Sequence, residues 1–183
     1  LGQTSTQRAS QRRAMLLDAA LELFGTHGYP AGSVKTLCNA AGLTERYFYE
    51  SFRDREACLA AAYDDLSTQL RARTSQAITA AAPDLDATIA AGLGAFVGYL
   101  TEDPRRARVV LIEVVGVSAA MEQCRHAVLR EYAELVASIW ATARSQPLPL
   151  RERLTCVAVV GGINHLLVDW LLNQPEPAKI ILA

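Results

Sequence analysis

Apolar residues recur every three to four positions along nearly the whole chain, and short glycine- or proline-containing breaks separate the repeats. In the first repeat, Leu16, Ala19, Leu23 and Phe24 fall on one helical face. No segment shows the strict apolar–polar alternation of a half-buried strand. With 183 residues, 51% of them hydrophobic, the chain is large enough to bury a core. The sequence therefore predicts an all-α fold.

The breaks carry residues that start and stop helices. We expect Gly25 to Gly28 to end the first long helix, because glycine readily takes the left-handed cap conformation. Ser33 should cap a short second helix that ends at Gly42. Thr44 should cap a short third helix, and Asp54 a longer fourth one.

Four more helical segments follow. Pro83-Asp84 should start a helix, Asp103-Pro104 the next, and a third should reach about Arg144. The expected inward residues of the first and third are Ile89, Leu93, Phe96 and Leu100, and then Val128, Tyr132, Leu135 and Ile139. The segment from Leu150 to Leu172 is apolar on nearly all sides, so we expect it to be buried, with a second subunit as one surface that could cover it.

Composition excludes several classes of protein. The formal net charge of −1 excludes a strongly cationic protein, although not a local basic patch. The apolar stretches 89–100 and 109–121 are shorter than the roughly 20 residues of a transmembrane helix. No signal peptide is recognisable, so we expect a cytoplasmic protein without a membrane partner.

The cysteines carry no metal or disulfide pattern. Cys38, Cys58, Cys124 and Cys156 are scattered without a CxxC pair, which favours buried thiols. A redox sensor that uses Cys38 or Cys124 stays open as an alternative. We expect no cofactor and no metal.

Three short helices with tight breaks at 28–32 and 42–43 predict a helix-turn-helix within the first 60 residues. The second helix of such a pair can enter the major groove of DNA. On it, Arg46 and Tyr47 should point outward, whereas Phe48 and Phe52 should point inward. The guanidinium of Arg46 is a donor fork suited to guanine or phosphate.

The segment from Ala19 to Leu59 resembles the DNA-binding domain of the TetR family of transcriptional repressors. The matching residues, in order, are Phe24, Gly28, Tyr29, Ser33, Ala40, Ala41, Gly42, Leu43, Tyr49, Phe52 and Leu59. The chain departs from the family pattern at Arg55, where lysine is usual, and at Leu37-Cys38, where Ile-Ala is common. Glu45 and Tyr47 in the recognition helix should give an unusual operator preference.

The resemblance implies a division of roles in DNA binding. Ser33, Tyr49 and Arg55 would hold phosphates, and the bases would be faced by Thr44, Glu45, Arg46 and Tyr47. Backbone or minor-groove contacts could come from Arg8, Arg12 and Arg13 in an amino-terminal arm. Residues 1–62 hold seven basic and six acidic groups, so a basic patch must arise from spatial segregation.

The resemblance also implies two domains: residues 1–56 for DNA binding and residues 57–183 for effector binding and dimerisation. Polar or aromatic residues in apolar surroundings are candidate effector contacts, because buried polar groups need partners. The candidates are Tyr63, Phe96, Tyr99, Glu113, Trp140, Asn164 and His165. Gly161-Gly162 more readily allows a close helix crossing than a phosphate site. In the family a fuller final helix normally completes the dimer bundle, and the sequence leaves the extent of this helix around the apolar Ile180 to Ala183 open.

The sequence therefore predicts a homodimeric repressor that binds double-stranded DNA at a palindrome-like operator and is released by a small, largely apolar effector. An enzyme is disfavoured, because His27, His126 and His165 are widely scattered and no HExxH or GxSxG motif occurs. A helical protein-interaction or redox-sensing regulator without a small-molecule effector stays open as the alternative.

Overall fold

The computed structural model describes residues 4–82 and 84–173, and none of these lies in a strand. Pro83, which was expected to start a helix, and the apolar segment Ile180 to Ala183 lie outside the described residues. The helices are α1 Ser5–His27, α2 Val34–Ala41, α3 Glu45–Ser51, α4 Arg55–Ala80, α5 Leu85–Glu102, α6 Pro104–Arg108, α7 Ala119–Arg144 and α8 Leu150–Asn173. A 3₁₀ turn, Tyr29–Ala31, precedes α2, and a π-helical turn, Val109–Glu113, follows α6.

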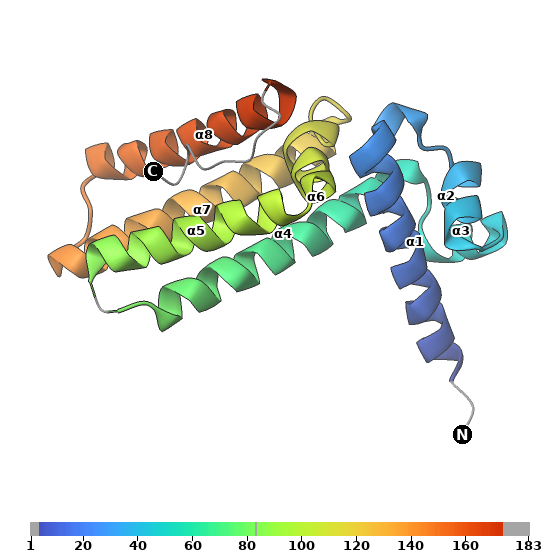
Figure 1. Cartoon of the computed structure of the whole chain (residues 1–183), viewed down its shortest axis with the longest axis horizontal. Helices are drawn as coiled ribbons and strands as arrows, with labels where there is room; N and C mark the ends of the chain where they lie inside the picture. The colour runs from blue at the N-terminus through green and yellow to red at the C-terminus, as the bar shows by residue number, and fades with distance from the viewer. Residues whose placement is uncertain (1–3, 83, 174–183) are drawn as a thin grey trace.

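The elements form two groups (Figure 1). The long helices α4, α5, α7 and α8 run side by side as an elongated bundle, and α1 to α3 sit at one end of it. Helix α4 passes from the small group into the bundle. The all-α architecture predicted from the sequence is confirmed.

Local capping chemistry explains most helix boundaries. Ser33 forms a capping box with Thr36, and the Asp54 carboxylate accepts the Ala57 N–H at 2.8 Å. Gly42 ends α2 with φ of 65°, a left-handed conformation that glycine adopts without strain. Thr44 precedes α3 as expected, but its side chain accepts no capping hydrogen bond.

Helix α1 ends within its expected stop and begins inside the expected amino-terminal arm. It continues through Gly25 to His27 and ends at Gly28, whose φ is 86°. It already begins at Ser5, because Thr4 and Gln7 form a capping box. The described part of the expected amino-terminal arm is therefore helical.

The core of the small group is built from the apolar faces of α1 to α4. Leu16 and Phe24 of α1, Leu37 of α2 and Phe48 of α3 are all fully buried. Phe52 is also buried, and its ring centroid lies 5.6 Å from that of Phe48. The inward orientation predicted for Phe48 and Phe52 is confirmed.

Helix α1 also packs against α6 and so joins the small group to the bundle. Gly25 lies directly on the Arg105 backbone, where an added Cβ would approach the Arg105 Cα to 2.8 Å. Glu22 pairs with the Arg105 guanidinium on the rim of this contact. The absence of a side chain at position 25 therefore allows the two helices to touch.

Two burial predictions are wrong within the described bundle. Ile89 is 50% exposed, because α5 turns this residue toward an opening rather than toward α4. Helix α8 was expected to be buried all round, yet it buries Cys156, Leu167 and Trp170 and exposes its other face. The exposed apolar residues of α8 are Leu150, Leu154, Val157, Val159, Leu166 and Leu172.

Helix α8 is also the one described helix that is long and apolar enough to cross a membrane by length and composition. The sequence survey missed it because the stretch is interrupted by polar residues such as Asn164 and His165. An exposed apolar helix face requires a covering surface of some kind.

The α1–α6 contact yields a stability prediction. Gly25→Ala should lower the free energy of unfolding by about 1–3 kcal/mol, because its Cβ would overlap rigid Arg105 backbone. Gly98→Ala is the matched control, because nothing lies within 4 Å of its added Cβ and alanine favours a helix by up to ~1 kcal/mol. Urea unfolding monitored by circular dichroism distinguishes the two. Equal stability of both variants would contradict the close contact.

Candidate DNA-binding surface and effector cavity

Helices α2 and α3 form a helix-turn-helix. The left-handed Gly42 reverses the chain between them, and the Leu43 N–H donates to the Cys38 carbonyl at 2.9 Å. Fully buried Phe48 anchors α3, so the opposite face of this short helix is turned to solvent. Glu45, Arg46 and Tyr49 are exposed there.

The Arg46 side chain, which is predicted to read bases, has a relative exposure of 85%. Its Nε donates to Glu50 Oε1 at 3.1 Å, one helical turn along. Thr44 is exposed beside it at the start of α3. Tyr47 is only half-buried rather than fully outward, because the Arg12 guanidinium lies 4.4 Å above its ring.

Arg12 and Arg13 fasten α1 to α3. Arg12 also pairs with Glu50 at 3.5 Å. Arg13 donates to the Ser51 carbonyl at 3.2 Å and lies 4.4 Å above the Phe52 ring. Both guanidinium groups are thus engaged inside the domain, whereas Arg8 is exposed on α1.

Arg55, half-buried at the start of α4, holds the turn that precedes α2. Its Nη1 donates to the carbonyls of Tyr29 at 3.2 Å and Gly32 at 2.9 Å. Its guanidinium lies 4.1 Å above the Tyr29 ring. A planar fork can make these contacts together, which a lysine ammonium cannot reproduce. The departure from the family's lysine therefore has a local structural reason.

The start of α2 offers donors next to an exposed cation. The Ser33 hydroxyl accepts the Thr36 N–H and so serves as a cap. Lys35, exposed in the first turn of α2, is a candidate phosphate contact that the motif comparison missed. The sequence could have indicated this role, because Lys35 lies two residues after the capping serine.

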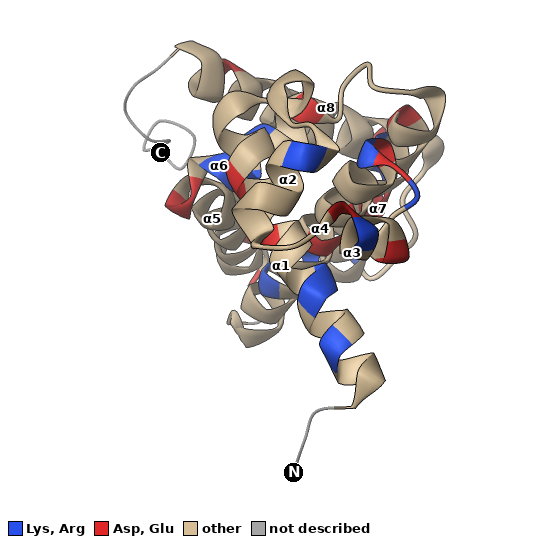
Figure 2. Cartoon of the chain, turned by 90° about the vertical axis from the view of Figure 1, so that its right-hand side faces the viewer, with Lys and Arg blue, Asp and Glu red and all other residues tan. Residues whose placement is uncertain are grey.

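Charge on this end of the molecule is mixed. Figure 2 shows basic segments on α1, α2 and α3, with acidic segments among them. Glu50 is central to the pattern, because it pairs with both Arg12 and Arg46. Binding of a phosphate backbone here must therefore draw on individually placed cations rather than on a uniform basic face.

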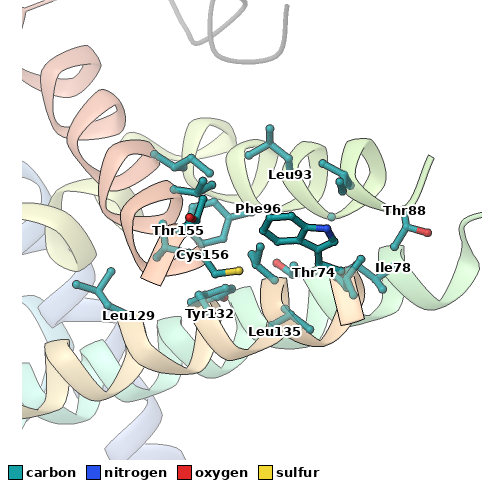
Figure 3. Close-up of a pocket in the computed structure, with 18 of the residues that line it drawn as sticks. Thr74, Ile78, Thr88, Leu93, Phe96, Leu129, Tyr132, Leu135, Thr155 and Cys156 are labelled. Atoms are coloured by element: carbon teal, nitrogen blue, oxygen red, sulfur yellow. The ribbon is translucent and has the colours of Figure 1, made fainter. Parts of the chain in front are cut away.

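A second feature is a cavity of about 400 Å³ within the bundle. Side chains from α4, α5, α7 and α8 converge on it (Figure 3). Half-exposed Ile89 and Val159 line it, so it reaches the surface between α5 and α8. None of its lining residues is charged.

Three of the predicted effector contacts line this cavity: Phe96, Trp140 and Asn164. The other four lie elsewhere. Tyr63 is buried in α4, where burial raises the pKa of its hydroxyl to about 12, and His165 is exposed on α8. The Tyr99 hydroxyl donates to Gln69 at 3.1 Å, away from the cavity.

Glu113 lies at the junction between the small group and the bundle. Its carboxylate accepts the Tyr29 N–H at 2.6 Å and the Arg108 Nε at 2.8 Å. Sequence reasoning missed Cys156, Val159 and Val160 as cavity residues, because a core position and a cavity wall have the same apolar pattern.

Three of the four thiols are buried: Cys38, Cys58 and Cys156. Burial raises the pKa of each, and Glu45 adds to the rise at Cys38. A raised pKa disfavours the reactive thiolate, which weighs against a redox role for Cys38. Cys124 is exposed.

The contacts of Arg55 yield a prediction. Arg55→Ala should lower the free energy of unfolding by about 1–3 kcal/mol, because two half-buried carbonyls lose their donor. Arg53→Ala, which removes an exposed cation paired with Asp54, should change it by less than about 1 kcal/mol. Thermal unfolding checks both. A neutral Arg55→Ala would show that this residue does not hold the turn.

Comparison with known proteins agrees with the geometry. Residues 16–62 match the family described as bacterial regulatory proteins, tetR family. The HTH-type transcriptional regulator AcrR of Shigella flexneri is 25% identical over 180 residues, which span 93% of this chain and 83% of AcrR.

Solved structures share the fold. The fatty acid degradation regulator FadR of Bacillus halodurans has a TM-score of 0.82 at 17% identity, covering 93% of this chain and 90% of its own. FadR of Bacillus subtilis, solved in complex with stearoyl-CoA, has a TM-score of 0.78 at 18% identity, covering 90% of each chain. Together with the helix-turn-helix geometry, these findings show that residues 16–62 form a TetR-type DNA-binding domain and that the chain shares the fold of TetR-family regulators.

Proposed function

We propose that this regulator is a homodimeric repressor that leaves its operator when a small, largely apolar effector fills the cavity. The observation that carries the proposal is the course of α4. Its first residue, Arg55, holds the turn before α2, and its later residues Thr74 and Ile78 line the cavity. One helix therefore contacts both the DNA-binding group and the effector cavity.

The proposed DNA contacts fall on two helices. Thr44, Glu45 and Arg46 would face bases, and Tyr49 would hold a phosphate beside them. Tyr47 would reach a base only with its exposed edge, because Arg12 covers one ring face. Ser33 and Lys35 would meet a phosphate at the start of α2, and Arg55 would act by positioning this helix. Residues 1–56 would then form the DNA-binding domain and residues 57–183 the regulatory domain.

A second copy of the chain is the proposed cover for the exposed face of α8. The face is apolar, and none of the residues that the structure describes lies within 4 Å of a Cβ added at Gly161 or Gly162. In a dimer with a two-fold axis at this face, each subunit would contribute one recognition helix. The two recognition helices would enter successive major grooves, whose centres lie roughly 34–36 Å apart. That arrangement reads a palindrome-like operator. It also explains the apolar helix without a membrane, in keeping with a cytoplasmic regulator.

Release requires the effector to prefer one arrangement of the domains over another. The cavity touches α4 and α5, and α5 continues through Asp103 into α6, on which Gly25 of α1 rests. A ligand that spreads α4 from α5 would therefore shift α1 and Arg55 and change the distance between the two reading heads. The stearoyl-CoA complex of the Bacillus subtilis relative supports an apolar ligand.

The rival reading, a helical protein-interaction or redox-sensing regulator without an effector, leaves the cavity without a role. An uncharged cavity of about 400 Å³ within a bundle suits a small ligand better than a protein partner. The proposed release of DNA by an effector needs no cofactor, metal or catalytic group, in keeping with a regulator rather than an enzyme.

DNA binding is tested by fluorescence anisotropy with the DNA that flanks the protein's own gene. The wild type should bind tightly, and its affinity should fall steeply with salt. Arg46→Ala should lose about 1–3 kcal/mol of specific binding, because a bidentate base contact disappears. Arg130→Ala, which removes an exposed cation from α7, is the matched control and should bind like the wild type. Equal affinity of Arg46→Ala and wild type for the best fragment of a genomic selection would refute the role of Arg46.

Dimerisation is tested by light scattering after size-exclusion chromatography. Val157→Asp should convert the dimer to a monomer, because it places a charge in the centre of the apolar α8 face. Thr79→Asp, on the exposed face of α4, should remain dimeric. A Val157→Asp protein that stays dimeric would move the interface elsewhere.

A further inference from the structure

Arg46 turns an open edge of its guanidinium to solvent. Its Nε donates to Glu50 Oε1 at 3.1 Å, and its side chain is 85% exposed. Among the residues that the structure describes, none accepts a hydrogen bond from its Nη1 or Nη2. These two terminal nitrogens form a planar donor pair that matches the O6 and N7 acceptors of guanine in the major groove. The hydrogen bond to Glu50 therefore leaves a base-reading edge of Arg46 available.

Glu50 is itself held from the other side. Its Oε2 lies 3.5 Å from Nη2 of Arg12, whose side chain is only 24% exposed. The Arg12 guanidinium in turn lies 4.4 Å above the ring of Tyr47. Arg12 belongs to the long helix α1, whereas the other three residues belong to α3. One carboxylate thus connects a half-buried arginine of α1 to the exposed arginine of α3.

Helix stability does not account for the pair of Arg46 and Glu50. Arg46 lies in the first turn of the seven-residue helix α3, and Glu50 lies in its last turn. Each charge opposes the helix dipole, which favours acids in the first turn and bases in the last. The order of the pair, with the arginine four residues before the glutamate, is also the less favourable one. Glu50 further brings a negative charge to the face on which DNA binding is proposed.

Orientation of Arg46 is what the pair can supply. An arginine side chain has many rotamers, and ordering it during binding has an entropic cost. The contact of Nε with Glu50 restricts those rotamers in the free protein, and Arg12 restricts Glu50. Less ordering therefore remains to be done when the terminal nitrogens of Arg46 meet a base.

We propose that Glu50 is a positioning residue for base recognition: it orients Arg46 so that Nη1 and Nη2 meet O6 and N7 of a guanine in each operator half-site. Its negative charge also weakens binding to the phosphate backbone of every sequence. This inference rests on the proposed base-reading role of Arg46, and it specifies both the base and the residue that orients the side chain.

The first measurement identifies the base. An operator is selected from random duplex DNA with the wild-type protein, and each variant operator changes one base pair in both half-sites. Fluorescence anisotropy should show that Arg46→Ala loses discrimination at one G·C pair and keeps it at the others. Unchanged discrimination by Arg46→Ala at every pair would refute base reading by Arg46, which is part of the proposed function. A loss at an A·T pair would leave that role standing and overturn the guanine assignment.

Glu50→Ala then tests the positioning. Its discrimination at the same G·C pair should fall roughly 3- to 10-fold, the size expected when one flexible side chain must be ordered during binding. Glu50→Gln should keep most of this discrimination, because its amide oxygen can still accept from Nε of Arg46. In the Arg46→Ala background, Glu50→Ala should cause no further loss at this pair. Wild-type discrimination by Glu50→Ala, or a loss confined to a different pair, would overturn the proposal.

Binding to a duplex without the operator separates positioning from damage to the fold. Glu50→Ala and Glu50→Gln should both bind this duplex roughly 2- to 5-fold more tightly than the wild type, because each removes a negative charge that faces phosphates. A misfolded variant would instead bind both duplexes more weakly. Glu131→Gln, which removes an exposed acid paired with Arg71 in the bundle, is the matched control and should bind both duplexes like the wild type. Weaker binding of the non-operator duplex by Glu50→Ala would overturn the proposal.

Discussion

The close contact between α1 and α6 is the constraint on which the arrangement of this molecule depends. It requires a residue without a side chain at position 25, because the Arg105 backbone occupies the space that a Cβ would need. Around it, Glu22 pairs with Arg105, and the buried Glu113 carboxylate accepts the Tyr29 N–H across the same junction. Tyr29 in turn lies beneath Arg55, the first residue of α4. The junction thus links the turn before α2 to both α4 and α6 through a short chain of buried and half-buried contacts.

The electrostatics of the DNA-facing end follow from this packing. The family resemblance predicts that basic residues near the helix-turn-helix contact DNA. In the structure, however, Arg12, Arg13 and Arg55 contact aromatic rings and backbone carbonyls of the domain itself. Their charge still contributes to the field around the DNA, while their geometry serves the fold. Arg46 differs because, within the described part of the chain, it pairs with Glu50 on the same exposed helix face. That pair occupies its Nε, so its two terminal nitrogens can meet a base.

The bundle separates two apolar surfaces with different roles. On the outer face of α8, a Cβ added at Gly161 or Gly162 would meet none of the described residues within 4 Å, which leaves room for a second protein surface. The inner side of the same helix, with Cys156 and Val160, closes a cavity against α5 and α7. One helix, apolar on nearly all sides, thus carries both a cavity wall and an exposed apolar face, and this explains why its sequence pattern indicates burial although leucine and valine are exposed.

The sequence by itself determined the helices and their boundaries around the helix-turn-helix, because caps such as Ser33 with Thr36 and the turn at Gly42 act within about four residues. It also determined which aromatic residues of α3 face inward, since 3.6-residue periodicity is a local property. Only the tertiary structure decided the partners of long side chains: Arg55 meets Gly32 across 23 positions, and Glu113 meets Tyr29 across 84. It likewise decided that Phe96, Trp140 and Asn164 share a cavity wall with Tyr132, while Tyr63, Tyr99, Glu113 and His165 do not. An apolar or polar residue at a given helical position does not show whether the neighbouring helix fills the space beside it, because that depends on how four separate helices pack.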